Sequence, residues 1–146
     1  MDYRQLAKDL LKRKKQLEAA VRSLELQSEQ LKADATSCKS PSFSPSNAAK
    51  YGYDNCQDRL IAILAKVDEC ELRKKTVLRE LKMIEIGMSV LNVYQRDLLE
   101  CFFTDRKKGA ADDLCAKYYK ERSCIYRDRQ KAVDAFTAAI FGVTEL

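Results

Sequence analysis

The chain has 146 residues, of which 34% are charged and 46% are hydrophobic, and its formal net charge at pH 7 is +5. This length allows one domain, or one small domain with an extended element, and the composition excludes an intrinsically disordered chain. Only four glycines and two prolines occur, which favours long helices over a sheet with many tight turns.

The net positive charge suits an acidic partner without proving one. The chain contains no long apolar run, so we expect no membrane-spanning segment and no membrane partner. The first residues, MDYRQLAKDLLKRKK, contain no apolar core of a signal peptide. We therefore expect a cytoplasmic protein.

The six cysteines form no Cys-x-x-Cys pair, and the chain contains no histidine. We expect no zinc site, because such sites are built from closely spaced cysteine or histidine ligands. Cys70, Cys101 and Cys115 are interpreted as small buried apolar residues. There is also no phosphate-binding glycine loop and no nucleophile elbow, so we predict neither an enzyme nor a cofactor.

Residues 2–35 are predicted to form one long helix with a narrow, heptad-like apolar stripe. Such a stripe needs a partner for stability. It consists of Leu6, Leu10, Leu17, Val21, Leu24 and Leu31. The basic run at residues 12–15, KRKK, is interpreted as a solvated helix face, with a phosphate-binding patch as the alternative.

Residues 36–55 read TSCKSPSFSPSNAAKYGYDN and are predicted to form a loop, because Ser, Pro, Asn and Gly dominate and no periodicity survives. The simplest interpretation is a flexible connection at the tip of two antiparallel helices. Phe43, Tyr51 and Tyr53 support the alternative that the loop contacts a partner, because a purely flexible linker has little use for aromatic side chains.

Residues 56–91 contain the most regular pattern of the chain, an apolar seam with spacings of three and four residues. The seam consists of Leu60, Ile63, Val67, Cys70, Lys74, Val77, Leu81, Ile84, Met88 and Leu91. Lys74 is its one charged member and is expected to fix register or oligomeric state. We predict an antiparallel helical hairpin over residues 1–91 that forms a homodimer, since dimerisation would bury the wide stripe of this second helix.

Residues 92–146 are predicted to form three short helices in a helix-turn-helix arrangement. Asn92 and Gln95 form a capping-box pattern at the first helix, and Gly109 permits the turn after it. The expected inward positions of the first helix are Val93, Leu98, Leu99, Phe102 and Phe103, and those of the second are Ala111, Leu114, Cys115 and Tyr118. Those of the third are Ile125, Ala132, Val133, Phe136 and Ile140. The predicted fold class is therefore all-α.

The third helix, near residues 122–135, is unusually basic, and the stretch Lys120–Ala132 reads KERSCIYRDRQKA. If its apolar residues face the core, four residues face away and three cations flank them. The outward residues are Ser123, Tyr126, Arg127 and Gln130, and the flanking ones are Arg122, Arg129 and Lys131. These side chains fit a recognition helix that reads base edges in the major groove of double-stranded DNA. A solvated surface helix is the alternative.

The stretch YQRDLLECFF…DLCAKYYKERSCIYRDRQKAVDAF resembles small phage-encoded regulators of the ArpU and RinA type. The matching features are Arg96, the pair Phe102-Phe103, Arg122-Ser123 with Ile125-Tyr126-Arg127, and Lys131-Ala132, together with the linker fragment SPSFS. The resemblance implies a helix-turn-helix akin to region 4 of sigma factors. It also implies a transcription activator of late or packaging genes in phages or prophages of Gram-positive bacteria.

The resemblance implies that Arg122, Ser123, Tyr126 and Arg127 read bases, and that Arg129 and Lys131 contact phosphates. The chain departs from the family pattern by acidic residues at Glu121, Asp128, Asp112 and Asp113. These acids favour a weaker DNA contact, with contact to RNA polymerase as a second role. Two other interpretations stay open, namely a phage terminase small subunit and a helical protein-interaction adaptor.

Overall fold

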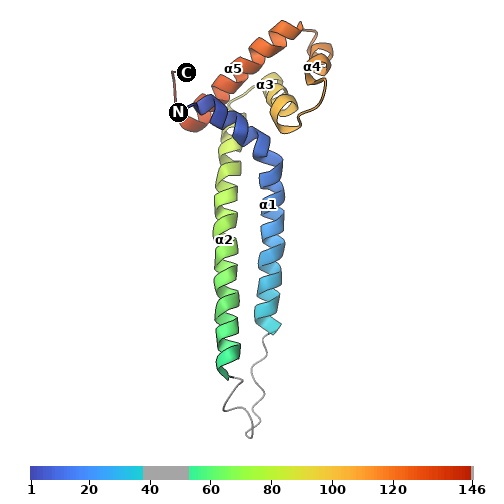
Figure 1. Ribbon diagram of the computed structural model, residues 1–146. Coiled ribbons are helices and arrows are strands. Elements are labelled where there is room, and N and C mark those ends of the chain that lie inside the picture. Colours follow the sequence, from blue (N-terminus) through green and yellow to red (C-terminus); the bar gives the residue numbers. More distant parts are fainter. Residues whose placement is uncertain (38–52, 146) are drawn as a thin grey trace. The chain divides into compact units, whose positions relative to one another are not determined.

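The computed structural model describes the backbone of residues 1–37 and 53–145 and consists of helices there, with no strand in these two ranges (Figure 1). The predicted all-α class is confirmed. The elements are α1 (Tyr3–Ser37), α2 (Tyr53–Ser89), α3 (Val93–Leu99), the π-helical turn η1 (Glu100–Thr104), α4 (Ala110–Tyr118) and α5 (Arg122–Phe141). Most of the predicted 36–55 loop lies outside the described residues, including Phe43 and Tyr51.

The contacts of the chain group into two compact units. Unit 1 consists of residues 1–18 and 79–146, and unit 2 consists of residues 19–78. Each unit therefore contains parts of both α1 and α2. The sequence predicts a division of the chain into a helical hairpin, residues 1–91, and a helix-turn-helix unit, residues 92–146. This division stays a prediction.

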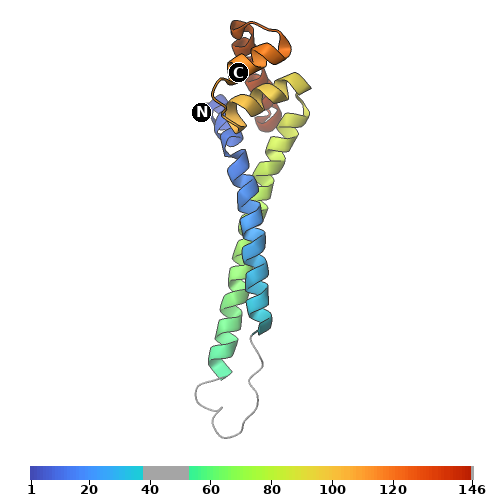
Figure 2. The ribbon, with the colours of Figure 1, turned by 90° about the vertical axis from the view of Figure 1, so that its right-hand side faces the viewer.

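In unit 2, the parts of α1 and α2 lie side by side (Figures 1 and 2). Glu25 of α1 pairs with Lys74 of α2 at 3.2 Å, and the Ser28 hydroxyl donates to Glu71 at 2.9 Å. The residue number rises along α1 while that of its partner falls along α2, which is the order of antiparallel helices. Leu24, Ile63, Val67 and Cys70 are buried in this unit, as the heptad pattern predicts.

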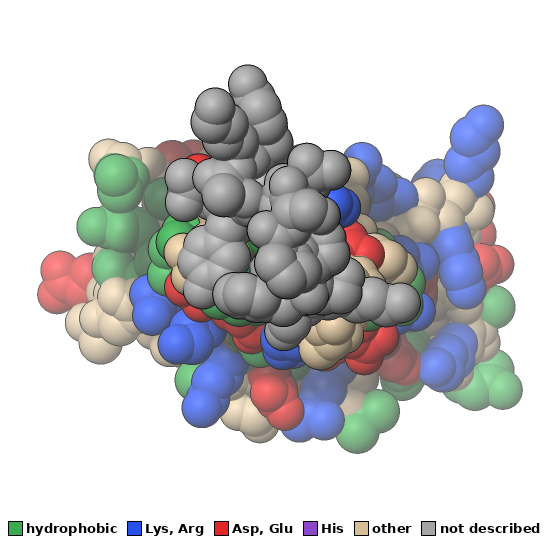
Figure 3. Space-filling model, turned by 90° about the horizontal axis from the view of Figure 1, so that it is seen from below, with side chains coloured by type: hydrophobic (Ala, Val, Ile, Leu, Met, Phe, Trp, Pro, Cys, Tyr) green, Lys and Arg blue, Asp and Glu red, His purple; other side chains and the backbone are tan. Residues whose placement is uncertain are grey.

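Lys74 does not leave an unpaired charge on the seam. Its side chain is largely covered, and its ammonium group lies against the carboxylate of Glu25 in the same chain. The predicted charged seam position is thus satisfied within unit 2. Figure 3, which views the molecule from below, shows both basic and acidic side chains on this surface.

In unit 1, the first turns of α1 pack against α5. Arg4 Nε lies 2.7 Å from Asp134 Oδ1, and the rings of Tyr3 and Phe141 are 5.3 Å apart. Ala7 and Leu11, in the same turns of α1, are fully buried.

The sequence prediction placed Leu6 and Leu10 inward instead, and it was wrong for Leu6, which is 42% exposed. The heptad pattern assumes that α1 faces only α2. The neighbours of its first turns include α5 and η1, and contact with them turns the buried face by one residue, about 100° around the helix.

The core of the C-terminal helices is built as the sequence predicts. Leu98, Leu114 and Ile125, one from each of α3, α4 and α5, form a buried cluster. Farther along α5, Ala132, Val133 and Phe136 are buried too. Cys101 and Cys115 are half-buried beside the cluster, and burial raises the pKa of the Cys101 thiol.

Gly87 lets α5 approach α2 closely within unit 1. A Cβ atom built at Gly87 would lie 2.5 Å from the Phe136 ring and 2.8 Å from Ile140. Any larger residue would push these side chains away, because such distances are far below van der Waals contact. Gly87 therefore determines how closely the C-terminal half of α5 packs against α2.

The corner between α2 and α3 is fixed by two devices. Asn92 and Gln95 form the predicted capping box, in which each side chain bonds the other residue's backbone N–H. Arg96 Nε also donates at 2.8 Å to the carbonyl oxygen of Met88, near the end of α2, which accepts a second hydrogen bond from the Leu91 N–H. Val93, predicted inward, is 70% exposed, because this first helical position points away from the core.

Among the helices that the structure describes, none has the length and apolar character required to cross a membrane.

Candidate nucleic-acid interface

The candidate interface is the N-terminal half of α5, together with the helices that pack against it. α4 ends at Tyr118, Tyr119 takes a left-handed conformation with φ of 53°, and α5 begins at Arg122. Both α3 and α4 pack against α5 (Figure 1). Tyr119 is 95% exposed, so its ring contributes little packing in unit 1.

The two faces of α5 agree with the faces predicted from its periodicity. Ile125, Ala132, Val133 and Phe136 are buried on one side. The residues on the other side that are exposed are Arg122, Ser123, Tyr126, Arg127, Gln130 and Lys131. The structure thus brings the predicted base-reading residues Arg122, Ser123, Tyr126 and Arg127 to one exposed surface, whereas their role in DNA binding stays a prediction.

Arg129 is only partly exposed, because its guanidinium group lies on aromatic rings. It is 4.8 Å from the Phe102 ring centroid and 4.9 Å from that of Tyr126. Phe102 and Tyr126 are themselves 5.8 Å apart. We call Phe102, Tyr126 and Arg129 the aromatic–arginine cluster, in which stacking and cation–π attraction restrain all three side chains.

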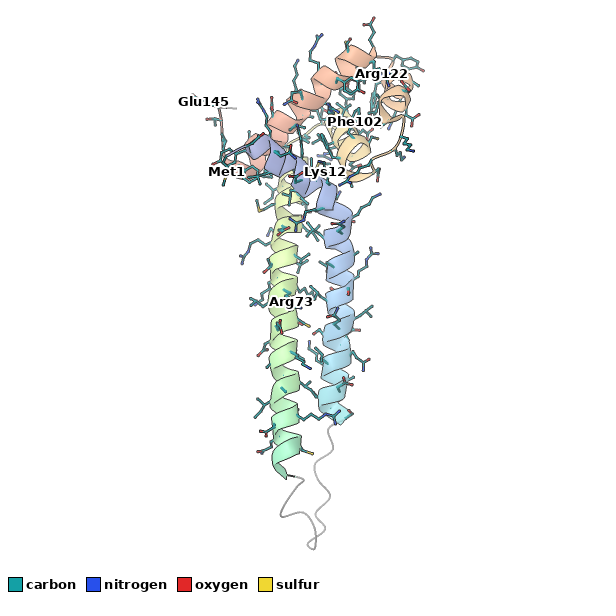
Figure 4. All side chains as sticks on the ribbon, viewed as in Figure 1. Met1, Lys12, Arg73, Phe102, Arg122 and Glu145 are labelled. Carbon is teal, nitrogen blue, oxygen red and sulfur yellow. The ribbon has the colours of Figure 1, made fainter. Side chains whose placement is uncertain are left out.

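The aromatic–arginine cluster depends on η1. Phe102 belongs to this π-helical turn, which follows α3 directly, and it is labelled in Figure 4. A π-helical turn changes the direction of the side chains that follow it, and such turns often occur at functional sites. No residue pattern in the sequence predicts the π-helical turn. The sequence therefore predicts a phosphate contact for Arg129 and misses its stacking on the ring of Tyr126.

Asp128 lies on the inner edge of α5 and is satisfied there. The Tyr94 hydroxyl donates to Asp128 at 2.7 Å, and Lys120 lies 3.1 Å from the same oxygen. The hydrogen bond from Tyr94, followed by contacts with Lys120, holds the pKa of Asp128 below its usual value. The negative charge of Asp128 is therefore balanced within the unit and does not stand alone beside the outward cations.

A second carboxylate fixes α4 to α3 in the same way. Asp97 accepts hydrogen bonds from Lys117, at 2.7 Å, and from the Tyr118 hydroxyl. These bonds lower the pKa of Asp97, with that from Lys117 the larger cause. The rings of Tyr94 and Tyr118 are 4.6 Å apart. The two carboxylates and two tyrosines thus form one network through α3, α4 and α5.

The remaining predicted DNA-binding residues differ in whether their side chains are paired with an acidic residue of the chain. Arg122 lies 3.7 Å from Asp112, and both side chains are well exposed, so this ion pair is weak and easily exchanged. Gln130 donates to Asp134 at 3.2 Å, which turns its amide toward the α1 side of the helix. Lys131 is exposed and forms no ion pair with a described residue.

Within the described ranges, no group of three or more histidine, cysteine, aspartate or glutamate side chains is arranged to hold a metal ion. Comparisons of the chain with protein-family models, with curated proteins and with solved structures find no match. Any conclusion about function therefore has to come from the residues of the site.

Proposed function

We propose that this protein is a DNA-binding transcription regulator of a phage or prophage, an activator of late or packaging genes, in which α5 reads the major groove. The single observation that supports this proposal is the arrangement of α5 around Ile125. This residue is fully buried, whereas the next two residues, Tyr126 and Arg127, are exposed. A recognition helix needs such a buried anchor beside its reading side chains.

The proposed reading surface is held rigidly. The network of Asp97 and Asp128 joins α3, α4 and α5, and the aromatic–arginine cluster restrains Tyr126. Rigid support matters, because base contacts discriminate only when the side chains are held in a fixed geometry. In this proposal, α4 and α5 are the two helices of a helix-turn-helix, and Tyr119–Glu121 is its turn.

We further propose that the protein forms a homodimer through an antiparallel hairpin of α1 and α2. Unit 2 carries several large apolar side chains on its exterior, which favours an additional helical partner. These exposed residues are Leu26, Ile61, Leu64, Leu72 and Leu78. A dimer would place two copies of α5 on two half-sites of double-stranded DNA. Contact with RNA polymerase is a second role that fits an activator.

The decisive experiment is a salt titration of binding to the DNA upstream of the protein's own gene, followed by selection of bound oligonucleotides. Phosphate-dominated binding predicts that affinity falls steeply and log-linearly with salt. A recognition helix also predicts one enriched sequence. An affinity that stays flat between low and moderate salt would contradict the proposal, and so would an unenriched oligonucleotide pool.

The exposed apolar side chains of unit 2 also fit a larger assembly, which is the observation that favours a terminase small subunit. Light scattering separates the two functions, since a ring of many copies supports the terminase and a dimer supports the regulator. A helical interaction adaptor would show no DNA binding even at low salt.

A further inference from the structure

The chain contains three short basic runs outside α5, at residues 12–15, 73–75 and 106–108. In the run at residues 73–75, Arg73 pairs with Glu69 and Lys74 with Glu25, so only Lys75 lacks an ion pair with a described residue. The remaining two runs differ in their contacts. The first run, at residues 12–15 of α1, is neutralised. All four of its side chains lie against carboxylates, Lys12 against Asp9 at 3.4 Å, Arg13 against Glu80 at 3.2 Å, Lys14 against Glu100 at 3.8 Å and Lys15 against Asp105 at 2.6 Å. All four cations of this run are paired with carboxylates of the same chain, which leaves none unpaired for a ligand.

The second run is Arg106, Lys107 and Lys108, between η1 and α4. All three are exposed, and none forms an ion pair with a described carboxylate. The nearest acid, Asp105, is already bound by Lys15, and the hydrogen bond from Lys15 is the main reason for its lowered pKa. Lys107 adds to that shift only through space.

The second run is held in a defined backbone. The Asp105 N–H donates to the carbonyl oxygen of Glu100 at 2.7 Å, and the Ala110 N–H donates to that of Lys107 at 3.3 Å. Arg106 takes a left-handed conformation with φ of 48°, which is uncommon for a residue other than glycine. Strained backbone of this kind costs free energy and tends to occur at functional positions.

The second run precedes α4, and the first turn of α4 contacts the start of α5. Asp112, in the first turn of α4, is four residues beyond Lys108 and pairs with Arg122 at 3.7 Å. Arg122 is the first residue of α5, and it is labelled in Figure 4. The turn that carries the three cations therefore leads directly into α4, whose first turn contacts the start of α5.

We propose that Arg106, Lys107 and Lys108 form a DNA-backbone clamp, a site that binds phosphate groups next to the bases read by α5. This proposal rests on the proposed DNA-binding function and adds a site to it. Unpaired cations on an ordered turn favour phosphates, which need charge and position but no base-specific hydrogen bonding. Asp112 and Asp113, both exposed in the first turn of α4, are the nearby acids that the positive charge of the three cations outweighs.

The test compares the wild-type protein with the triple variant Arg106→Gly, Lys107→Gln, Lys108→Gln. Glycine at position 106 accepts the left-handed backbone, so the charge is removed without added strain. Each lost phosphate contact makes the slope of log K against log salt shallower by roughly one unit, so the variant should lose about two to three units. The sequence enriched by selection should not change.

The matched control removes three exposed cations of unit 2, by Arg22→Ala, Lys66→Gln and Lys75→Gln, which form no ion pair with described residues. Its slope should equal that of the wild type. Circular dichroism on both variants checks that the helices are retained.

Three results would overturn the clamp, and they are distinguishable. If the wild type binds DNA and the triple variant keeps its slope, the clamp is absent while the proposed function stands. If the wild type fails to bind DNA at low salt, the proposed function and the clamp fall together. A triple variant that changes the enriched sequence would assign these residues to base reading instead.

Discussion

The hydroxyl of Tyr94, near the start of α3, donates a 2.7 Å hydrogen bond to the carboxylate of Asp128 in the middle of the exposed basic helix. Lys120 completes this contact from the turn before α5, with its ammonium group 4.2 Å from the centre of the Tyr94 ring. One hydrogen bond thus joins residues 34 positions apart and fixes the rotation of α5 about its own axis.

Tyr94→Phe should destabilise unit 1 by about 1–3 kcal/mol, because the half-buried Asp128 loses a charge-assisted hydrogen bond. Urea unfolding followed by circular dichroism measures this change. Tyr119→Phe is the matched control, since the Tyr119 side chain is almost fully exposed, and it should leave the midpoint unchanged. Equal midpoints for both variants would show that the Tyr94 hydrogen bond contributes nothing.

The stability of the protein should fall in acid because of Asp97 and Asp128. Both carboxyl groups have a pKa that is lower in the folded chain than in the unfolded chain. Their contribution is therefore complete above the unfolded pKa, about 3.9, and is lost as the pH falls through the lower folded values. Urea midpoints measured from pH 7 down to pH 2 should show this loss.

The double variant Asp97→Asn, Asp128→Asn should be less stable at pH 7 and should change less between pH 5 and pH 2. An unaltered acid profile in this variant would assign the acid sensitivity to other carboxylates, such as Glu71 in unit 2, whose pKa is lowered mainly by Ser28.

Periodicity predicted the buried positions of the helices where a single apolar stripe faces the core. Leu17, Ile125 and Phe136 are buried as expected, because an apolar stripe at helical spacing must face the core. The prediction that Leu6 is buried was wrong, because the neighbours of α1 change near its start. The cluster of Phe102 and Arg129 was also not predictable, because it depends on a π-helical turn and on contacts between elements distant in sequence.

Arg127 and Arg129 should behave differently although they are two residues apart on one helix. Arg127→Ala should leave thermal stability unchanged, cost about 1–3 kcal/mol of DNA binding and relax the preference at one base. Arg129→Ala should lower stability by about 0.5–1 kcal/mol, because its cation–π contacts with Phe102 and Tyr126 are lost.

Binding to selected and scrambled oligonucleotides, measured beside thermal unfolding, separates the two arginines. Equal loss of binding on every sequence in Arg127→Ala would reassign that residue to the DNA backbone. Arg129→Lys keeps the charge but stacks less well on the rings, so it should recover only part of the stability.

Gly87→Ala should destabilise unit 1 by about 1–3 kcal/mol, because the added methyl group overlaps the ring of Phe136. The double variant Gly87→Ala, Phe136→Leu should lose less than the sum of the two single variants, since the smaller side chain makes room for the methyl group. Strict additivity in urea unfolding would show that the close approach of α2 and α5 does not determine the packing there.

Leu72 tests the proposed dimer, because it is a large apolar side chain on the exterior of unit 2. A charge placed in a buried interface costs several kcal/mol, and each 1.4 kcal/mol weakens association about tenfold. Leu72→Lys should therefore convert the dimer to monomer in light scattering at micromolar concentration. Thr76→Lys places the same charge one turn farther along the same face of α2 and should weaken the dimer as well. A wild-type protein that is already monomeric at these concentrations would exclude the two-half-site geometry, because a single α5 could then occupy only one major groove.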